Sequence, residues 1–207
     1  MMLVIGLTGG VGSGKSTVSQ LLKEEYHAFV IDTDSLGHQV KLPGQEAYQP
    51  ILDLFGKEIL DEQGLIDKGK LAERVFGCEP LLQKLNAMIH PAVIREVERL
   101  IAEQRQDGSC PYVVVETALL IESGLTSCCD VIWYVHAKEQ VRRKRLKQSR
   151  GYSEERIQAV LDRQKTEAEF REVADAVIEN SGREEETWRQ VRLGIEQLGK
   201  DWKGRKK

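Results

Sequence analysis

The sequence lacks long hydrophobic stretches and an excess of positive charge, and each absence excludes a class of protein. Its longest apolar runs have the length of a β-strand, far below the ~20 residues that a membrane span requires. Lysine and arginine together number 30 against 33 aspartate and glutamate residues, which gives a net charge of −3. Dedicated nucleic-acid-binding proteins are usually strongly basic. We therefore expect neither a membrane nor a nucleic acid as partner.

Cysteine is scarce, with Cys78, Cys110, Cys128 and Cys129 as the four members. They form no C-x-x-C pair, and no histidine stands at zinc-ligand spacing from them. A disulfide between the adjacent Cys128 and Cys129 would be strained, so we expect four buried or incidental thiols. The start, MMLVIGLTGG, has neither a basic leader nor a cleavage-site pattern. A cytoplasmic location is the default expectation.

The hydrophobic pattern predicts an α/β fold. Short apolar runs rich in β-branched residues alternate with stretches of helical periodicity, as in proteins with a parallel sheet. Five strands are expected, at residues 3–7, 29–31, 112–115, 131–135 and 176–178. Their nearly continuous hydrophobicity indicates a sheet that is covered on both faces.

The strands are unevenly spaced, which predicts two insertions into a core of residues 1–36, 100–137 and 168–207. About eighty residues separate the second and third strands, far more than a usual crossover. This interval predicts a helical insertion over 37–99. A second charged segment, 138–167, is expected to form a mobile lid, because its few apolar residues predict few buried contacts. Both insertions leave the carboxyl ends of strands, where ligands bind in open α/β sheets.

The strongest motif is GGVGSGKS at residues 9–16, which fits G-x-x-x-x-G-K-[ST] between a predicted strand and a predicted helix. Its glycines let backbone N–H groups turn inward around phosphate oxygens at the helix N-terminus. Lys15 is expected to neutralise the β- and γ-phosphates and Ser16 to ligate Mg²⁺, while Thr17 would donate to the α-phosphate. The motif predicts a nucleotide site.

The rest of the pattern favours a small-molecule kinase. The Asn-Lys-x-Asp motif with which GTPases bind guanine is missing from the sequence. Two insertions would provide an acceptor site and a lid that excludes water. Asp32 and Asp34 end the second predicted strand, and strand alternation would put them on one side. Such a carboxylate can accept the proton of an attacking hydroxyl, although an Asx turn or a helix cap is the alternative at this position.

The sequence resembles the dephospho-CoA kinase family over nearly its whole length. The stretches LTGGVGSGKSTV and VIDTD carry the resemblance, together with residues 74–76, 85–91, 119–122 and 178–182 in the family's order and spacing. The resemblance implies a five-stranded P-loop kinase fold with a helical CoA domain and a helical lid. It also implies transfer of the γ-phosphate of ATP to the ribose 3′-hydroxyl of dephospho-CoA with Mg²⁺.

The family pattern assigns roles to individual residues. It implies that Asp34 is the general base and that Arg145 stabilises charge on the transferring phosphoryl group. The ATP site that it implies consists of Gly12, Ser13, Gly14, Lys15, Ser16, Thr17, Asn180 and Gly182. The acceptor residues that it implies, besides Asp34, are Arg74, His90, Leu119 and Leu120. Without the family pattern, Arg74 would be a solvated helix residue and His90 a helix cap before a proline.

The sequence departs from the family in the third-strand turn and in the lid. Where many relatives have Asp-Ile-Pro, this chain has Glu116-Thr117-Ala118, and the loss of proline is expected to loosen the turn. Glu116 would hold a Mg²⁺-bound water or act as a partly buried structural carboxylate. Arg142 replaces a frequent glutamine, a second lid arginine comes one place late as Arg150, and the segment from Gln164 lacks its proline. A solvated helix explains most of the basic lid residues.

Two other functions remain as alternatives at this stage. One is a P-loop kinase that acts on a nucleoside monophosphate or a sugar-like acceptor. The other is a nucleotide-binding regulator without turnover, associated with RNA through the lid. The sequence does not specify an oligomeric state, and we expect a monomer.

Overall fold

The computed structural model describes residues 2–204, with side chains described through residue 200. The chain divides into two compact units. One contains the residues up to 30 together with those from 104 onward, and the other contains residues 31–103. Each has fully buried hydrophobic side chains, such as Leu22 in the first unit and Ile51 in the second.

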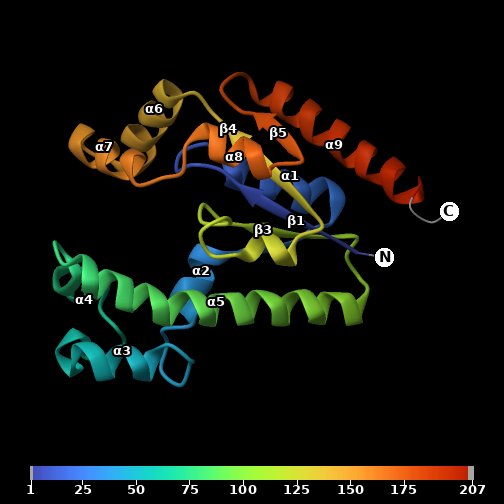
Figure 1. Cartoon of the computed structure of the whole chain (residues 1–207). Coiled ribbons are helices and arrows are strands. Elements are labelled where there is room, and N and C mark those ends of the chain that lie inside the picture. The colour runs from blue at the N-terminus through green and yellow to red at the C-terminus, as the bar shows by residue number, and fades with distance from the viewer. Residues whose placement is uncertain (1, 205–207) are drawn as a thin grey trace. The chain divides into compact units, whose positions relative to one another are not determined.

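Within the described residues, five strands form one sheet (Figure 1). They are β1 (Leu3–Thr8), β2 (Phe29–Asp32), β3 (Tyr112–Glu116), β4 (Val131–His136) and β5 (Ala176–Glu179). The order across the sheet is β2-β3-β1-β4-β5, so β1 is central. β1 runs parallel to β3 and to β4, and β4 runs parallel to β5. The predicted α/β fold with a five-stranded parallel sheet is confirmed.

Each strand extends one residue beyond the apolar run that predicted it. The five added residues are polar and stand at the carboxyl ends: Thr8, Asp32, Glu116, His136 and Glu179. Hydrophobic patterning stops where side chains are no longer packed between two layers, whereas backbone pairing continues. These polar ends occur at the edge where ligands bind to parallel sheets.

The core of the first unit lies between the sheet and two helices, α1 (Lys15–Tyr26) and α9 (Glu184–Gly204) (Figure 1). Ile5 and Leu7 alternate along β1 toward this face and are fully buried. The intervening Gly6 faces the other way, where a Cβ would lie 3.0 Å from Leu120 Cδ2. The segment after β3, which includes the short helix η2 (Leu125–Cys128), therefore covers the opposite face. Both faces of β1 are covered, as its composition predicted.

The cysteines are free thiols, as expected. Cys110 is buried and the others are partly exposed. Burial raises the pKa of Cys129 to about 12, and the nearby Cys128 and Asp130 act in the same direction. Cys129 therefore stays a neutral thiol at physiological pH.

The segment predicted to be a lid contains α6 (Glu139–Arg150) and α7 (Glu154–Asp162), and α8 (Glu167–Val173) follows. The expected scarcity of buried contacts is wrong at two positions, because Leu146 and Ile157 are 1% and 0% exposed. Arg143 of α6 donates through Nε to Glu139 Oε1 of its own helix at 2.8 Å, and its pairing with Glu154 of α7 at 3.5 Å links the two helices. The mobility of this segment stays a prediction.

The unit of residues 31–103 is helical. It contains α2 (Thr33–Gln39), α3 (Tyr48–Phe55), η1 (Lys57–Ile59), α4 (Lys68–Val75) and most of α5 (Glu79–Asp107). Asp67 caps α4 by accepting from the Lys70 N–H at 2.8 Å. Across the described part of the chain, no helix is both long enough and apolar enough to cross a membrane.

Two glycines of α9 test the packing of this helix on the sheet. A Cβ at Gly194 would lie 2.8 Å from Cζ2 of Trp133, whose ring is 1% exposed and held by the core. We expect Gly194→Ala to lower the free energy of unfolding by about 1–3 kcal/mol through overpacking. Gly199 has open space around its Cβ position. Gly199→Ala should therefore raise that free energy by up to about 1 kcal/mol, because alanine is the better helix former. Equal shifts in urea denaturation would contradict the close contact.

Candidate active site

The glycine-rich motif forms the loop between β1 and α1, in the predicted context. Gly9 has a φ of 147°, and Gly14, the residue before α1, has a φ of 92°, both in the region that favours glycine. A Cβ at Gly9 would overlap the carbonyl oxygen of Val135, and one at Gly14 would overlap the side-chain amide of Asn180. Conformation and space both require glycine here, so the backbone turns sharply into the N-terminus of α1.

The loop carries polar groups suited to an anion. Lys15 Nζ donates to the Gly9 carbonyl at 2.9 Å, which places the ammonium group at the loop. The hydroxyls of Thr8 and Ser13 are buried and make no hydrogen bond within the described residues. Leaving a buried hydroxyl unpaired typically costs about 1–3 kcal/mol, and such groups occur where a ligand provides the partner. The first N–H groups of α1 lack partners within the helix, as at every helix N-terminus.

Glu116 is held beside the loop by two serines of α1. It ends β3 in register with Leu7, at the point where β1 leads into the loop. Its Oε1 accepts from Ser16 Oγ at 2.7 Å and its Oε2 from Ser19 Oγ at 2.5 Å. The carboxylate is 9% exposed. Ser19 was missed by the sequence reasoning, although its i, i+3 spacing from Ser16 places both on one face of the helix.

Ser16 and Glu116 form a set of oxygen donors that suits Mg²⁺. This cation prefers oxygen ligands and is usually bound by one or two carboxylates plus water and substrate phosphates. Among the described residues, no group of three or more His, Cys, Asp or Glu side chains is arranged to hold a metal by itself. The donor set therefore fits a cation that arrives with a nucleotide.

Arg145 joins the lid segment to the loop and to the residue after β5. Its Nη1 donates to the carbonyl oxygens of Ser13 at 3.1 Å and Gly12 at 3.4 Å, and its Nη2 donates to that of Asn180 at 2.8 Å. The side chain is half-buried. Arg145 is therefore not one of the solvated charges of the lid helix, because its guanidinium contacts backbone carbonyls of the loop and of Asn180.

Asn180 is buried beneath the loop. Its Nδ2 donates to the Ser13 carbonyl at 2.7 Å, and its Oδ1 accepts from Thr187 Oγ1 at 2.9 Å. Thr187, which is 1% exposed, was also missed by the sequence reasoning, because nothing in its local sequence marks it. Gly182 follows on the exposed turn before α9. Asn180 therefore supports the loop through its side chain.

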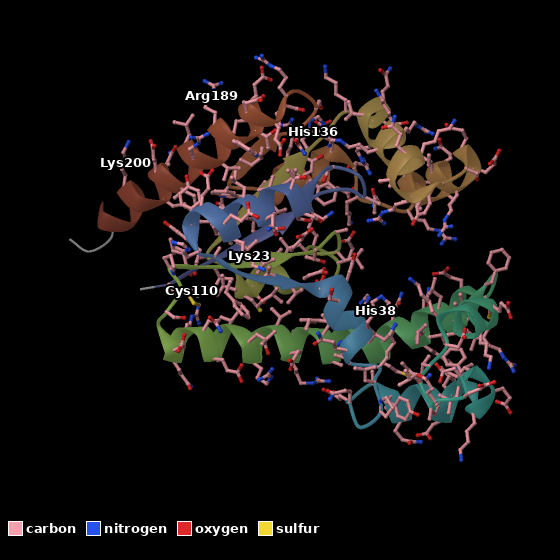
Figure 2. All side chains as sticks on the ribbon, turned by 180° about the vertical axis from the view of Figure 1, so that it is seen from behind. Lys23, His38, Cys110, His136, Arg189 and Lys200 are labelled. Carbon is pink, nitrogen blue, oxygen red and sulfur yellow. The ribbon has the colours of Figure 1, made fainter. Side chains whose placement is uncertain are left out.

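The carboxyl ends of β4 and β5 are joined by a histidine, which Figure 2 labels. His136 Nδ1 lies 2.5 Å from Glu179 Oε2, and its Nε2 lies 3.2 Å from Glu167 Oε2 at the start of α8. Burial raises the pKa of Glu179, but hydrogen bonds from Ser181 and His136 bring it below its ordinary value. These contacts tie the end of the lid segment to the sheet.

The turn after β3 differs from the expectation. Thr117 Oγ1 accepts from the Leu119 N–H at 3.1 Å, so a threonine closes the turn that lacks the family's proline. Leu120 is fully buried, whereas Leu119 is 45% exposed. Both leucines were predicted to bind the substrate that accepts the phosphoryl group. Leu119 presents an apolar surface, whereas Leu120 packs into the fold.

Asp34 belongs to the unit of residues 31–103 and lies in the first turn of α2. The strand-alternation argument is wrong, because β2 ends at Asp32 and a helix begins directly after it. Asp32 is the helix cap: its Oδ1 accepts from the Asp34 N–H at 3.0 Å and its Oδ2 from Ser35 Oγ at 2.6 Å. The Asp34 carboxylate is exposed.

Arg74 and His90 also belong to this second unit. Arg74 is exposed in the last turn of α4. His90 is half-buried within α5, which continues through Pro91 as one helix of 29 residues. The alternative that made His90 a helix cap is therefore wrong, and the rule that a proline ends a helix does not hold here.

Comparisons with known proteins identify the family. The sequence model of dephospho-CoA kinase matches residues 3–186. The dephospho-CoA kinase of Carboxydothermus hydrogenoformans is 40% identical over 200 residues, covering 96% of this chain and 96% of that protein. That of Geobacillus kaustophilus is 42% identical over 193 residues, covering 92% of this chain and 94% of that protein. This chain belongs to the dephospho-CoA kinase family.

A solved structure agrees with this membership at the level of the fold. Dephospho-CoA kinase from Campylobacter jejuni superimposes with a TM-score of 0.72 at 21% sequence identity. The match covers 97% of this chain and 99% of that one. The resemblance that the sequence predicted is confirmed, and this chain has the P-loop kinase fold.

Removing the Arg145 guanidinium tests its structural contribution. We expect Arg145→Ala to lower the free energy of unfolding by about 1–3 kcal/mol, because partly buried carbonyls of Ser13 and Asn180 lose a charged donor. Lys147→Ala on the same helix is the control, since Lys147 is 67% exposed and pairs only at 3.5 Å with Glu154. Urea denaturation should show little change in the control. Equal losses in the two variants would contradict the role of Arg145.

Proposed function

We propose that this chain transfers the γ-phosphate of ATP to the ribose 3′-hydroxyl of dephospho-CoA and releases coenzyme A and ADP. The family match over residues 3–186 carries this conclusion. The loop geometry supports it, because a glycine-rich loop leading from a parallel strand into a helix N-terminus is suited to phosphate. A monomeric enzyme in the cytoplasm is part of the same proposal.

The ATP phosphates would be bound by the loop and by the start of α1. In this proposal backbone N–H groups of the loop and of the first turn of α1 surround the β-phosphate, Lys15 neutralises the β- and γ-phosphates, and Thr17 donates to the α-phosphate. The buried hydroxyl of Ser13, without a partner among the described residues, supports a polar ligand at the loop. Asn180 and Gly182 would line the adenine side, since both follow β5 and Asn180 contacts the loop.

Mg²⁺ would be held by Ser16 directly and by Glu116 directly or through water. When bound, the cation neutralises charge on the β- and γ-phosphate oxygens. Glu116 accepts the Ser16 hydroxyl proton in a hydrogen bond, which leaves the serine lone pairs for a cation. Ser19 occupies the second carboxylate oxygen and fixes the carboxylate plane.

The acceptor would be bound by the helical insertion over residues 37–99, with the segment 138–167 as the lid. Arg74 is an exposed cation suited to an acceptor phosphate, and His90 and Leu119 would contact the same substrate, whereas Leu120 is fully buried and would support Leu119 from within the fold. Asp34 is proposed as the general base for the 3′-hydroxyl. Its carboxylate is exposed, whereas both oxygens of Asp32 are engaged in capping α2. This difference favours Asp34 over Asp32.

The direct test is ADP release with different acceptors. Dephospho-CoA should support turnover, and AMP, CMP and ATP alone should not. Turnover with a nucleoside monophosphate would instead favour a kinase for that acceptor. ATP binding without ADP release for any acceptor would favour a regulator.

Replacing the loop lysine tests the phosphate site. We expect Lys15→Ala to lower kcat by about two to three orders of magnitude, the usual effect of removing one preorganised charge. Lys23→Ala is the matched control, because Lys23 is an exposed lysine at the other end of α1. Circular dichroism should show both variants folded. A near-normal kcat for Lys15→Ala would refute the phosphate-loop assignment.

Replacing the two aspartates tests the general base. We expect Asp34→Asn to lower kcat by about two to four orders of magnitude while ATP affinity, measured by calorimetry, changes little. Asp32→Asn is the control, since asparagine caps helices about as well as aspartate. If Asp32→Asn lost activity and Asp34→Asn did not, the roles of the two carboxylates would be reversed.

A further inference from the structure

Both ends of the lid segment bind one residue of the phosphate loop, Val11. From α6, Arg142 Nε donates to the Val11 carbonyl at 3.0 Å. From the turn between α7 and α8, Gln164 Oε1 accepts from the Val11 N–H at 3.2 Å. The guanidinium Nη2 of Arg142 also donates to Gln164 Oε1, which joins the two side chains to each other. We call this arrangement of Arg142, Gln164 and Val11 the Val11 clamp.

The Val11 clamp depends on the absence of a side chain at Gly10. A Cβ there would overlap the Arg142 guanidinium and lie 2.8 Å from Gln164 Oε1. The φ of Gly10 is not in the left-handed region, so a Cβ would act on the positions of these two side chains and not on the backbone conformation. The loop sequence and the two lid residues are thus fitted to each other.

Arg142 is a half-buried cation next to the phosphate loop. Burial lowers the pKa of its guanidinium. Its two hydrogen-bond acceptors, a peptide carbonyl and an amide oxygen, carry no net charge. Glu139 acts on this pKa in the opposite direction, but a partly buried cation whose direct contacts are neutral loses hydration without gaining an ion pair. A phosphate group at the loop would supply negative charge close to it.

We infer that Arg142 and Gln164 are positioning residues for the nucleotide, which hold the tip of the phosphate loop in its binding conformation before ATP arrives. This inference rests on the proposed binding of ATP at the loop. Fixing Val11 in advance reduces the ordering that the loop undergoes on binding, which raises affinity. It also couples the lid to the loop, because movement of either end of residues 138–167 must break a hydrogen bond to Val11.

The test compares single alanine variants of the clamp with a control on the same helix. Arg142→Ala and Gln164→Ala should each speed exchange of the Val11 amide hydrogen in the ligand-free protein by about tenfold, as expected for loss of one hydrogen bond that holds Val11 in place. The KM for ATP should rise by a similar factor, with the KM for dephospho-CoA little changed. Lys144→Ala removes an exposed charge from α6 and should change neither quantity. Exchange at single amides is measured by NMR.

Two further variants separate positioning from charge and guard against misfolding. Gln164→Glu keeps an oxygen that can accept from the Val11 N–H and from Arg142, but its negative charge neutralises the charge of Arg142. The Val11 amide should stay protected in this variant while the KM for ATP rises. Arg142→Gln keeps a long polar side chain, and its effects should be in the direction of Arg142→Ala. The double variant Arg142→Ala/Gln164→Ala should fall short of the summed effects, because both side chains hold Val11 and contact each other.

Specific outcomes would overturn the inference. Val11 exchange that is unchanged in both alanine variants would refute the clamp. If the Val11 amide exchanged faster in both alanine variants but their KM for ATP equalled that of Lys144→Ala, the clamp would have no role in nucleotide binding. A wild-type chain that neither binds ATP nor releases ADP would refute the proposed function, and the exchange data would still report on the clamp in that case.

Discussion

The carbonyl groups of the phosphate loop constrain the rest of the site, because a loop that binds anions must turn its carbonyl oxygens away from the ligand. Each carbonyl from Gly9 to Gly14 accepts a hydrogen bond from within the protein. In the order of the six carbonyls from Gly9 to Gly14, the donors are Lys15 Nζ, the Ser13 N–H, Arg142, Arg145, Arg145 together with Asn180, and the N–H groups of Thr17 and Val18. Cationic side chains serve most of these carbonyls, so positive charge is concentrated around the loop.

This arrangement gives the lid segment a structural role as well as the catalytic one proposed for it. Arg142 and Arg145 stand three residues apart on α6 and therefore face the same way. Both guanidinium groups bind loop carbonyls, and Leu146 is buried next to Gly12. An isolated exposed charge would contribute little to the free energy of unfolding. These partly buried contacts contribute more, because they hold the helix against the loop. Opening of the lid would therefore alter the loop.

The polar ends of the strands connect α1 and the end of the lid segment to the sheet. Glu116 of β3 holds two serines of α1, and His136 of β4 contacts Glu179 of β5 and Glu167 of α8. The central place of β1 in the sheet puts β3 and β4 on either side of the strand that carries the loop. The topology thus brings neighbours from both sides to a single loop.

The sequence by itself determined the five strands, the loop motif and the family, because apolar runs and glycine spacing are local signals that survive without tertiary context. It did not determine the partners of the loop. Ser19 and Glu116 are 97 residues apart, and Val11 and Gln164 are 153 apart, with no pattern to pair them. Local rules also failed at Pro91, where α5 continues, and at Asp34, where a helix replaces the expected strand end. Tertiary structure decided these points, because a hydrogen bond between distant residues depends on how the strands are ordered and packed, which local residue preferences do not encode.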